Sequence, residues 1–385
     1  MREGWTYKKL GEITKVINGL WIGKKPPLKT VAVIRNTNFT KDCKLSTTNI
    51  AYIDVEEKQF EKKRLLQGDI IIEKSGGSEK QPVGRPILFN LIGGEFSFSN
   101  FTSVIRIDNP NEIISPFLHL ALYGAYLRGE TLKMQAKTTG IHNLDFKAYN
   151  RILIPIPSLQ EQQQIVSELD LLSSVIEKQK AQIEELDKLA QSIFYDMFGD
   201  PVENERGWEV KKLNEVSTLI NGRAYKQNEL LNEGKYKVLR VGNFFTNSNY
   251  YYSDLELEQN KYCDYGDLLF AWSASFGAFI WQGGKVIYHY HIWKVLYNEQ
   301  YLNKTFYCYL LNTMTNSFMK DVHGIGMVHL TKEGMEQYLL PLPPLSLQQE
   351  FANKIQAIES MKAKVRQSLK ESEMLFNSRM DFYFS

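Results

Sequence analysis

The sequence predicts an α+β fold: two mixed α/β domains related by a pseudo-two-fold axis and separated by two long antiparallel coiled-coil helices. Three observations predict it. The opening segment of the chain recurs in its middle, a closing segment recurs in the same order, and a heptad pattern of apolar residues follows each closing segment. We therefore expect domains at 1–157 and 200–343, a central helix at 158–199 and a distal helix at 344–385.

An internal repeat frames the chain. Its matching segments are 4–12 (GWTYKKLGE) with 207–215 (GWEVKKLNE), Ile-Asn-Gly at 17–19 and 220–222, and 154–159 (IPIPSL) with 340–345 (LPLPPL), the last pair soon followed by Gln-Gln. The openings lie 203 positions apart and the closings 186, so the first copy holds 17 more residues. A shared frame around interiors that differ in length and sequence indicates two copies of one recognition domain, each specific for a different target. Drift after a gene duplication is the alternative.

Each copy begins with short β-branched runs separated by turn residues, a pattern typical of strands. Strands are expected at 31–34, 69–72 and 104–107 in the first copy and at 237–240, 267–270, 278–281 and 293–296 in the second. One helix is expected over 116–127, with Ser115 as its N-cap, and its counterpart over 301–312. These elements predict a mixed α/β domain in each copy.

Apolar residues then recur in steps of four and three, which predicts a long helix with one apolar seam in each copy. Ser158 opens a capping box at the first helix, and Gly199 followed by Pro201 ends it. Ser346 would cap the second helix two residues later than the seam register requires. Two long seams in one register favour packing of the helices on each other, and the alternative is that each packs on its own domain. The seam residues are Ile165, Leu169, Leu172, Ile176, Ile183, Leu186, Ile193, Phe351, Ile355, Ile358, Val365, Leu369 and Phe376.

The composition excludes several classes of protein. The net charge of the 385 residues is +2, so any attraction to nucleic acid must come from local patches or from another subunit. Cys43, Cys263 and Cys308 have neither disulfide nor metal spacing, which favours a reducing cytoplasm. The sequence shows no signal peptide and no apolar run near the roughly 18 residues of a membrane helix, so we expect a cytoplasmic protein without a membrane partner.

Together, the motifs resemble the specificity subunit of type I restriction-modification systems. The resemblance spans nearly the whole chain and is carried by the two openings with Ile-Asn-Gly, by Gly-Asp strands at 68 and 266, and by the closings before each helix. Each motif alone is weak, but their order and duplication are specific. The family implies two target-recognition domains, each reading one half of a split double-stranded DNA sequence, in a DNA methylation complex. It also implies a non-catalytic subunit that recruits two methyltransferase subunits and, through them, the restriction subunits.

The same resemblance implies no cofactor on this chain, with S-adenosylmethionine, ATP and Mg expected on the partner subunits only. The geometry agrees with it. A helix of about 35 residues is on the order of 50 Å long, and half-sites one turn of B-DNA apart lie roughly 34–36 Å from each other. The helical pair would therefore set the number of bases left unread.

Polar loops within each copy are the candidate DNA contacts, because base reading needs polar side chains and phosphate binding needs cations. An ordinary solvated surface is the alternative for all of them. The candidates are Lys24, Lys25, Lys74, Ser75, Ser78, Lys80, Arg85, Lys137, Thr138 and His142 in the first copy and Arg223, Lys226, Trp272, Ser273, His289, His291 and His323 in the second.

Two other readings remain open. His289 and His291 would share one face of a strand, but no third ligand with metal spacing is evident, so no metal site is expected. An enzyme would need a motif for its cofactor, yet the sequence has no P-loop, no glycine-rich nucleotide fingerprint and no Asn/Asp-Pro-Pro-aromatic motif of an adenine methyltransferase. A duplicated scaffold or ligand-binding protein unrelated to DNA is the third class.

Overall fold

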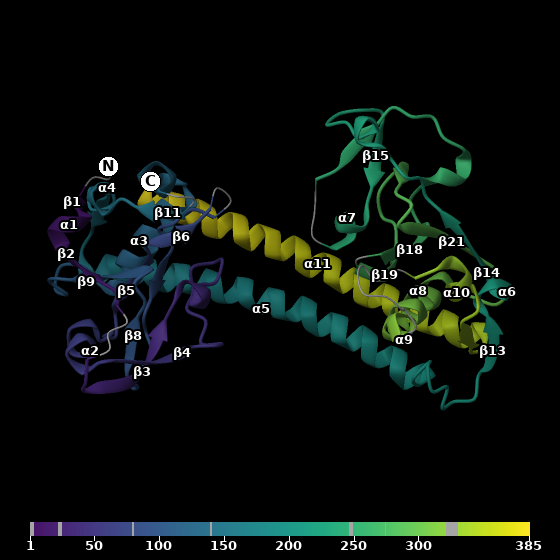
Figure 1. Ribbon diagram of the computed structural model, residues 1–385, viewed down its shortest axis with the longest axis horizontal. Helices are drawn as coiled ribbons and strands as arrows, with labels where there is room; N and C mark the ends of the chain where they lie inside the picture. Colours follow the sequence, from purple (N-terminus) through teal and green to yellow (C-terminus); the bar gives the residue numbers. More distant parts are fainter. Residues whose placement is uncertain are drawn as a thin grey trace. The chain divides into compact units, whose positions relative to one another are not determined.

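The computed structural model describes residues 4–21, 25–78, 81–138, 141–245, 249–273, 275–320 and 330–385 (Figure 1). The chain forms two units: unit 1 contains Met1–Lys180 with Ser368–Ser385, and unit 2 contains Ala181–Gln367. Two helices of 40 residues, α5 (Leu159–Phe198) and α11 (Leu345–Phe384), contribute residues to both units. The predicted α+β class with two mixed domains and long helices is confirmed.

Unit 1 is built on a four-stranded sheet of order β2-β9-β5-β7 and a three-stranded sheet of order β4-β3-β8. Two small sheets, β1-β12 and β10-β11-β6, complete it. Its strands are β1 (Thr6–Lys9), β2 (Thr14–Asn18), β3 (Leu28–Ile34), β4 (Ala51–Glu56), β5 (Ile70–Glu73), β6 (Ser75–Gly77), β7 (Pro86–Leu88), β8 (Phe96–Phe98), β9 (Thr102–Ile107), β10 (Gln135–Thr138), β11 (Ile141–Leu144) and β12 (Leu153–Ile156). Its short helices are α1 (Leu10–Ile13), α2 (Glu57–Lys63), α3 (Ser115–Leu127) and α4 (Phe146–Tyr149).

Unit 2 repeats this topology. Sheet β14-β21-β18-β19 matches β2-β9-β5-β7, and the parallel pair β15-β20 matches the parallel pair β3-β8. Its strands are β13 (Glu209–Lys212), β14 (Ser217–Asn221), β15 (Tyr236–Leu239), β16 (Tyr251–Ser253), β17 (Tyr262–Cys263), β18 (Leu268–Ser273), β19 (Ser275–Ile280), β20 (Val286–Tyr288), β21 (Ile292–Tyr297) and β22 (Leu339–Leu342). Its short helices are α6 (Leu213–Val216), α7 (Val241–Phe245), α8 (Lys304–Thr313), α9 (Thr315–Lys320) and α10 (Lys332–Glu336).

The repeated opening and closing segments form one small sheet in each unit, which explains why they recur together. β1 pairs antiparallel with β12, with Thr6 opposite Ile156, and β13 pairs with β22, with Glu209 opposite Leu342. These ladders close each unit on itself just before its long helix begins. The repeat in the sequence is therefore a repeat of the hydrogen-bonded frame.

A buried glutamine attaches the start of each long helix to its unit. Gln162 is fully buried; it donates to the carbonyls of Glu112 and Pro157 at 2.9 and 3.0 Å and accepts from Ile114 N–H at 2.9 Å. Gln348 repeats this set with Tyr301 O, Pro343 O and Asn303 N–H at 2.8–2.9 Å, the same three directions. A buried amide with every strong bond made holds its surroundings in one geometry, because losing any partner leaves a polar group unsatisfied.

Helices α5 and α11 pack antiparallel within each unit. In unit 1 the Arg379 guanidinium contacts Glu168, and Gln179 Nε2 donates to Ser368 Oγ at 2.9 Å. In unit 2 Lys362 pairs with Asp187 at 2.6 Å. All thirteen predicted seam residues are buried or half-buried in this arrangement. Both packing alternatives occur together, because several seam residues near the helix ends also join the core of their unit.

The helix ends bury residues outside the predicted seam. Phe194, Phe198, Met380 and Phe384 are all buried, since each helix end meets its own unit as well as the other helix. A strict seam describes only the middle part of each helix, where Ile183 and Val365 are half-buried.

The predicted helix starts are partly right. Ser158 Oγ accepts from Glu161 N–H at 3.2 Å, which is half of the predicted capping box, and the Glu161 carboxylate accepts from Trp5 Nε1 at 3.1 Å instead of completing it. Gly199 follows α5 with φ +76°, as predicted. The cap at Ser346 is wrong, because α11 begins at Leu345, with Leu347 N–H already bonded to Pro344 O at 2.9 Å. The cap at Ser115 is wrong by one residue, because Ile114 occupies the N-cap of α3.

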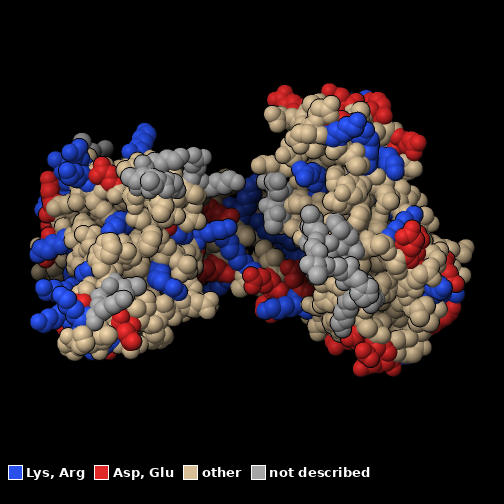
Figure 2. All heavy atoms as spheres, in the orientation of Figure 1, with Lys and Arg blue, Asp and Glu red and all other residues tan. Residues whose placement is uncertain are grey.

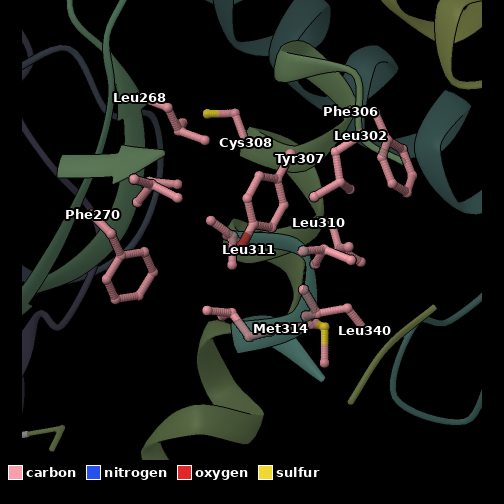
Figure 3. Close-up of a cluster of buried hydrophobic side chains, with 14 of the residues drawn as sticks. Leu268, Phe270, Leu302, Phe306, Tyr307, Cys308, Leu310, Leu311, Met314 and Leu340 are labelled. Atoms are coloured by element: carbon pink, nitrogen blue, oxygen red, sulfur yellow. The ribbon is translucent and has the colours of Figure 1, made fainter. Parts of the chain in front are cut away.

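The aromatic core of unit 2 gives a stability prediction. Phe194 on α5 is fully buried, with its ring centroid 5.6 Å from that of Phe351 and 5.9 Å from that of Phe306 (Figure 3 shows Phe306 among its neighbours). Phe194→Ala should lower the free energy of unfolding by about 3–5 kcal/mol, because it leaves a cavity. Leu189→Ala, at an exposed position of the same helix, should change it by about 0.5 kcal/mol or less. Denaturant unfolding measures both, and equal losses would show that α5 is not packed into this core.

Candidate functional site

Three chain reversals lie together in each unit and form a shared frame. The arginine turn (35–38; 240–243 in unit 2) follows strand β3 or β15, and its first N–H donates to the side chain of Asn38 or Asn243 at 3.0 or 2.8 Å. The bridge turn joins β8 to β9 at 99–101, or β20 to β21 at 289–291. The corner is at 74–75, where β5 leads into β6; at the equivalent place in unit 2, Ser273 at the end of β18 pairs with Ser275 at the start of β19.

The repeated Ile-Asn-Gly lies against the bridge turn, which explains its glycine. A Cβ on Gly19 would lie 1.8 Å from Ser99 O, and one on Gly222 would lie 2.3 Å from Tyr288 O. Both distances are far inside contact, so only glycine fits. The residue after each glycine then forms a parallel bridge, Leu20 with Ser99 and Arg223 with His289. The motif therefore positions the bridge turn and the segment that follows it.

The corner is held on the bridge turn by backbone hydrogen bonds. Lys74 N–H donates to Phe101 O at 2.9 Å, and Trp272 N–H donates to His291 O at 3.1 Å at the equivalent place. In unit 1 the Asn36 Nδ2 also donates to Ser75 O at 2.6 Å, which joins the arginine turn to the corner. The three reversals thus form a fixed platform in each unit, assembled from segments far apart in the sequence.

The side chains on the two platforms differ. In unit 1 the arginine and bridge turns enclose a cavity of about 450 Å³, whose residues include Arg35, Asn36, Ser99 and Phe101. In unit 2 the bridge turn His289-Tyr290-His291 forms an aromatic cluster with Trp272, whose indole Nε1 donates to Tyr290 O at 2.9 Å. The frame is shared, and the chemistry it presents is not.

His289 carries no charge at neutral pH. Burial, and then the nearby His291 and Arg240, lower its pKa to about 4. A neutral imidazole can donate and accept hydrogen bonds but supplies no cation for a phosphate. Among the three chain reversals of unit 2 the cation is Arg240, whose exposed guanidinium lies 5.2 Å from the centroid of Tyr251.

The platforms contain several of the predicted DNA contacts. Lys74 is half-buried, Ser78 is exposed next to the unit 1 corner, and Trp272, His289 and His291 form the unit 2 cluster. Lys25 and Lys226 are exposed beyond each Ile-Asn-Gly, and His142 is half-buried on β11 opposite Gly77. Lys24, Lys80 and His323 lie outside the described residues. Lys137 and Thr138 belong to β10, and only their backbone is described.

Arg85 is buried and paired with a carboxylate, which argues against the DNA contact predicted for it. Its side chain is buried, its Nε lies 2.7 Å from the Glu73 carboxylate, and its Nη1 donates to the carbonyls of Phe39 and Thr40. The sequence placed Arg85 near a polar loop but did not reveal that a buried carboxylate faces it. Ser75 and Ser273 are buried as well, and the Ser75 hydroxyl is bonded to Asn143.

Arg223 is half-buried and paired with a carboxylate. It donates to both oxygens of Glu229 at 2.8 and 2.9 Å, and this pairing is the largest cause that lowers the pKa of Glu229 to about 2. Its charge is thereby largely neutralised at neutral pH, which weakens its case as a phosphate contact.

Sequence reasoning missed the arginine turns. Arg35 and Arg240 occupy the same place in the two copies, each with an asparagine three residues later. Their recurrence in both copies could have marked them as site residues, but Arg35 directly follows a predicted β-strand and Arg240 is the last residue of another, which favoured a structural interpretation. Asn36 and Ser99 had no signal, because only the fold brings them together.

These observations define the class: a duplicated α/β module whose two platforms share a frame and differ in side chains. The family model for the type I restriction modification DNA specificity domain matches residues 2–188 and again residues 205–371. The chain belongs to this family of type I restriction-modification specificity subunits, so DNA sequence specificity within such a complex is its function.

Known relatives agree over most of the chain. The putative type I restriction enzyme MjaX specificity subunit of Methanocaldococcus jannaschii is 23% identical over 93% of this chain and 88% of its own length. The EcoKI specificity subunit of Escherichia coli is 29% identical over 70% of this chain and 61% of its own. The specificity subunit from M. genitalium superposes with a TM-score of 0.53 at 14% identity, covering 99% of this chain and 96% of that one. A chain from a structure described as the basis of complex assembly and conformational transition of the type I R-M system superposes with a TM-score of 0.59 at 18% identity, covering 100% of this chain and 98% of that one. At these identities the two structures show a shared fold.

The described residues contain no group of three or more His, Cys, Asp or Glu side chains arranged to hold a metal ion. No helix in the described part of the chain is both long and apolar enough to span a membrane.

The Arg85–Glu73 pair gives a second prediction. Arg85→Ala should lower the free energy of unfolding by about 3–5 kcal/mol, because it leaves a buried carboxylate without its partner. Lys74→Ala, at the neighbouring corner, should change it by about 0.5 kcal/mol or less. Denaturant midpoints at neutral pH measure both. A small effect of Arg85→Ala, together with weaker DNA binding, would instead make Arg85 a DNA contact.

The lowered pKa of His289 gives a third prediction, on how stability depends on pH. Because its folded pKa of about 4 lies below the ordinary value of about 6.5, the unfolded chain takes up a proton first as pH falls. The contribution of His289 to stability should be complete above pH 6.5 and decline between about 6.5 and 4. His289→Gln should therefore flatten the fall of the thermal midpoint between pH 7 and pH 5. His119, whose pKa burial also lowers to about 4, remains in both proteins as a common background. Parallel curves would show that His289 is not held neutral.

Proposed function

We propose that this chain reads a bipartite, asymmetric DNA sequence, with one half-site bound by each platform and an unread spacer between them. The observation that carries the proposal is the pair of matching platforms with different side chains. One frame repeated twice suits two contacts of the same kind, and different chemistry suits different bases.

Each platform offers a different mixture of contacts. In unit 1 the exposed Lys25 and half-buried Lys74 suit phosphates, and Asn36 and Ser99 suit base edges. In unit 2 the exposed Arg240 and Lys226 suit phosphates, and the cluster around Trp272 suits apolar and hydrogen-bonding contacts. These differences support two unlike half-sites.

The subunit would depend on its partners for affinity. Its net charge is +2, and Figure 2 shows Lys and Arg interspersed with Asp and Glu on the face in view. Because phosphate contacts dominate DNA affinity, such a surface favours weak binding alone, with the methyltransferase subunits supplying much of the phosphate contact.

The helices would set the spacer. A helix of 40 residues is about 60 Å long, and half-sites one turn apart lie roughly 34–36 Å from each other. A flexible linker could not fix such a gap, because its end-to-end distance fluctuates. The ion pairs and buried seam described above keep each helix from slipping along the other.

Exposed apolar residues on the helices would be the docking surface for partners. Leu171, Met374 and Phe382 in unit 1 are 66%, 63% and 55% exposed, and Leu189 in unit 2 is 46% exposed. Apolar side chains left in water along a helix favour a partner helix. In this proposal two methyltransferase subunits bind there and recruit the restriction subunits, and the chain itself performs no catalysis. S-adenosylmethionine, ATP and Mg would be bound by those partners only.

The test is the methylation pattern of a host that carries this chain with its methyltransferase subunits. We expect one split, asymmetric target with a constant gap. Asn36→Ala should relax base preference in one half-site and Trp272→Ala in the other, each by roughly 10- to 100-fold in discrimination. If both variants altered the same half-site, or if the target were unsplit, the assignment of one platform to each half would fail.

A matched insertion tests the spacer. Four residues, about one helical turn and 6 Å, would be added to both α5 and α11 near their midpoints. The recognised gap should lengthen by about two base pairs, since each occupies about 3.4 Å. Four residues added in the exposed loop at 232–233 should leave the gap unchanged. If the helix variant methylated DNA normally and recognised a target with an unaltered gap, the proposal that the helices set the spacer would be contradicted.

A further inference from the structure

The unit 1 cavity is the feature that platform geometry alone does not explain. It has a volume of about 450 Å³, within the range of about 300–1,000 Å³ typical of small-molecule sites and far above the share of one water. Its walls are largely apolar, from Leu20, Val33, Ile53, Val55 and Phe101. It opens between the arginine turn and the bridge turn, the two reversals that the proposed function assigns to DNA.

Three polar atoms of its lining residues lack a hydrogen-bond partner. They are Arg35 Nε, Asn36 Oδ1 and Ser99 Oγ, and all three are buried. Buried polar atoms without a partner are uncommon in folded proteins, and each one needs a reason. Here a donor, an acceptor and a hydroxyl that can be either belong to neighbouring residues of one cavity.

The same side chains are fixed by their other atoms. Arg35 Nη2 donates to Asn49 O at 3.3 Å, and Asn36 Nδ2 donates to Ser75 O at 2.6 Å. Ser99 is held by its backbone, because its N–H donates to Ile34 O and its carbonyl accepts from Thr102 Oγ1. The three side chains are therefore held beside the cavity before any ligand arrives, and a small rotation of each would bring its unpaired atom to the cavity surface.

This combination suits a flat heteroaromatic ring with donors and acceptors on its edge. Apolar walls and the Phe101 ring match the faces of such a ring, and mixed polar atoms match its edge. A phosphate would find a single guanidinium among apolar walls, which is a poor anion site. We propose that the cavity receives one nucleobase of the DNA bound by unit 1, turned out of the base stack. This inference rests on the proposed function, namely that unit 1 binds DNA.

The described residues of unit 2 do not offer the same site. Where unit 1 has Ser99 and Asn100, unit 2 has His289 and Tyr290, whose ring centroids lie 4.5 Å from each other. Tyr225 stacks on His289 at 6.3 Å. Rings thus stand at the positions where unit 1 presents a hydroxyl and an amide. The extruded base is assigned to the half-site of unit 1 alone.

Unstacking reporters test the inference in the complex with the methyltransferase subunits. Once the target is known, 2-aminopurine replaces each purine of the unit 1 half-site in turn, and pyrrolocytosine replaces each cytosine, so that fluorescence reports unstacking. Permanganate reactivity reports unstacking at each thymine. We expect a several-fold rise in signal on binding at one position other than the adenine that becomes methylated. Thr37→Phe, an exposed residue at the cavity, should return that signal to the level of free duplex. Thr218→Phe, an exposed threonine of unit 2, should leave it unchanged.

A second variant guards against misfolding. Ser99→Ala removes an unpaired hydroxyl without adding volume, so the thermal midpoint should hold while base discrimination at the reporting position falls several-fold. Specific methylation with every base of the half-site stacked, or a signal that survives both Thr37→Phe and Ser99→Ala, would overturn the inference and leave the proposed function standing. Absence of any sequence-specific methylation would overturn both.

Discussion

The structure depends on one interaction made twice: a buried glutamine that ties the first turn of each long helix to its unit. Gln162 and Gln348 are fully buried. Each donates to a backbone carbonyl just before its own helix. Each also donates to a carbonyl and accepts from an N–H in the loop that precedes a shorter helix of the same unit. Because both N–H groups and the oxygen of each amide are hydrogen-bonded, a change in the direction of the helix would leave a buried polar group without a partner. A fixed joint of this kind is what the proposed role of the helices in setting the spacer requires.

A second constraint fixes the platforms themselves. Gly19 and Gly222 let the bridge turn approach the end of the first strand, and the corner then bonds to the bridge turn. Neither step depends on the side chains that face outward. The platform can therefore keep its shape while its contents change from the Arg35, Asn36 and Ser99 set to the histidine and tryptophan cluster. This separation of frame from contents lets two copies of one fold present different side chains.

The repeat and the heptad seam were enough to predict the class of fold and its two long helices, because both are local patterns. The site was harder to predict. Arg85 looked like a loop cation until the fold set Glu73 beside it, and Ser99 had no local signal, since its neighbours Arg35 and Asn36 lie more than 60 residues earlier. The Ser346 cap failed because Pro344 already provides the first helical carbonyl. Local patterns show where an element runs, whereas contacts distant in sequence decide which side chains remain available.

The central claim is that the two halves are equivalent in frame and differ only in what they read. Its most direct test is the methylation pattern directed by a chain of residues 1–199 alone, with the methyltransferase subunits. Because the seam of α5 has the same register as that of α11, two such chains should pair antiparallel and direct methylation of a split palindrome built from the unit 1 half-site and its inverted copy. A folded, dimeric fragment that directs methylation of an asymmetric sequence, or of none, would contradict the account.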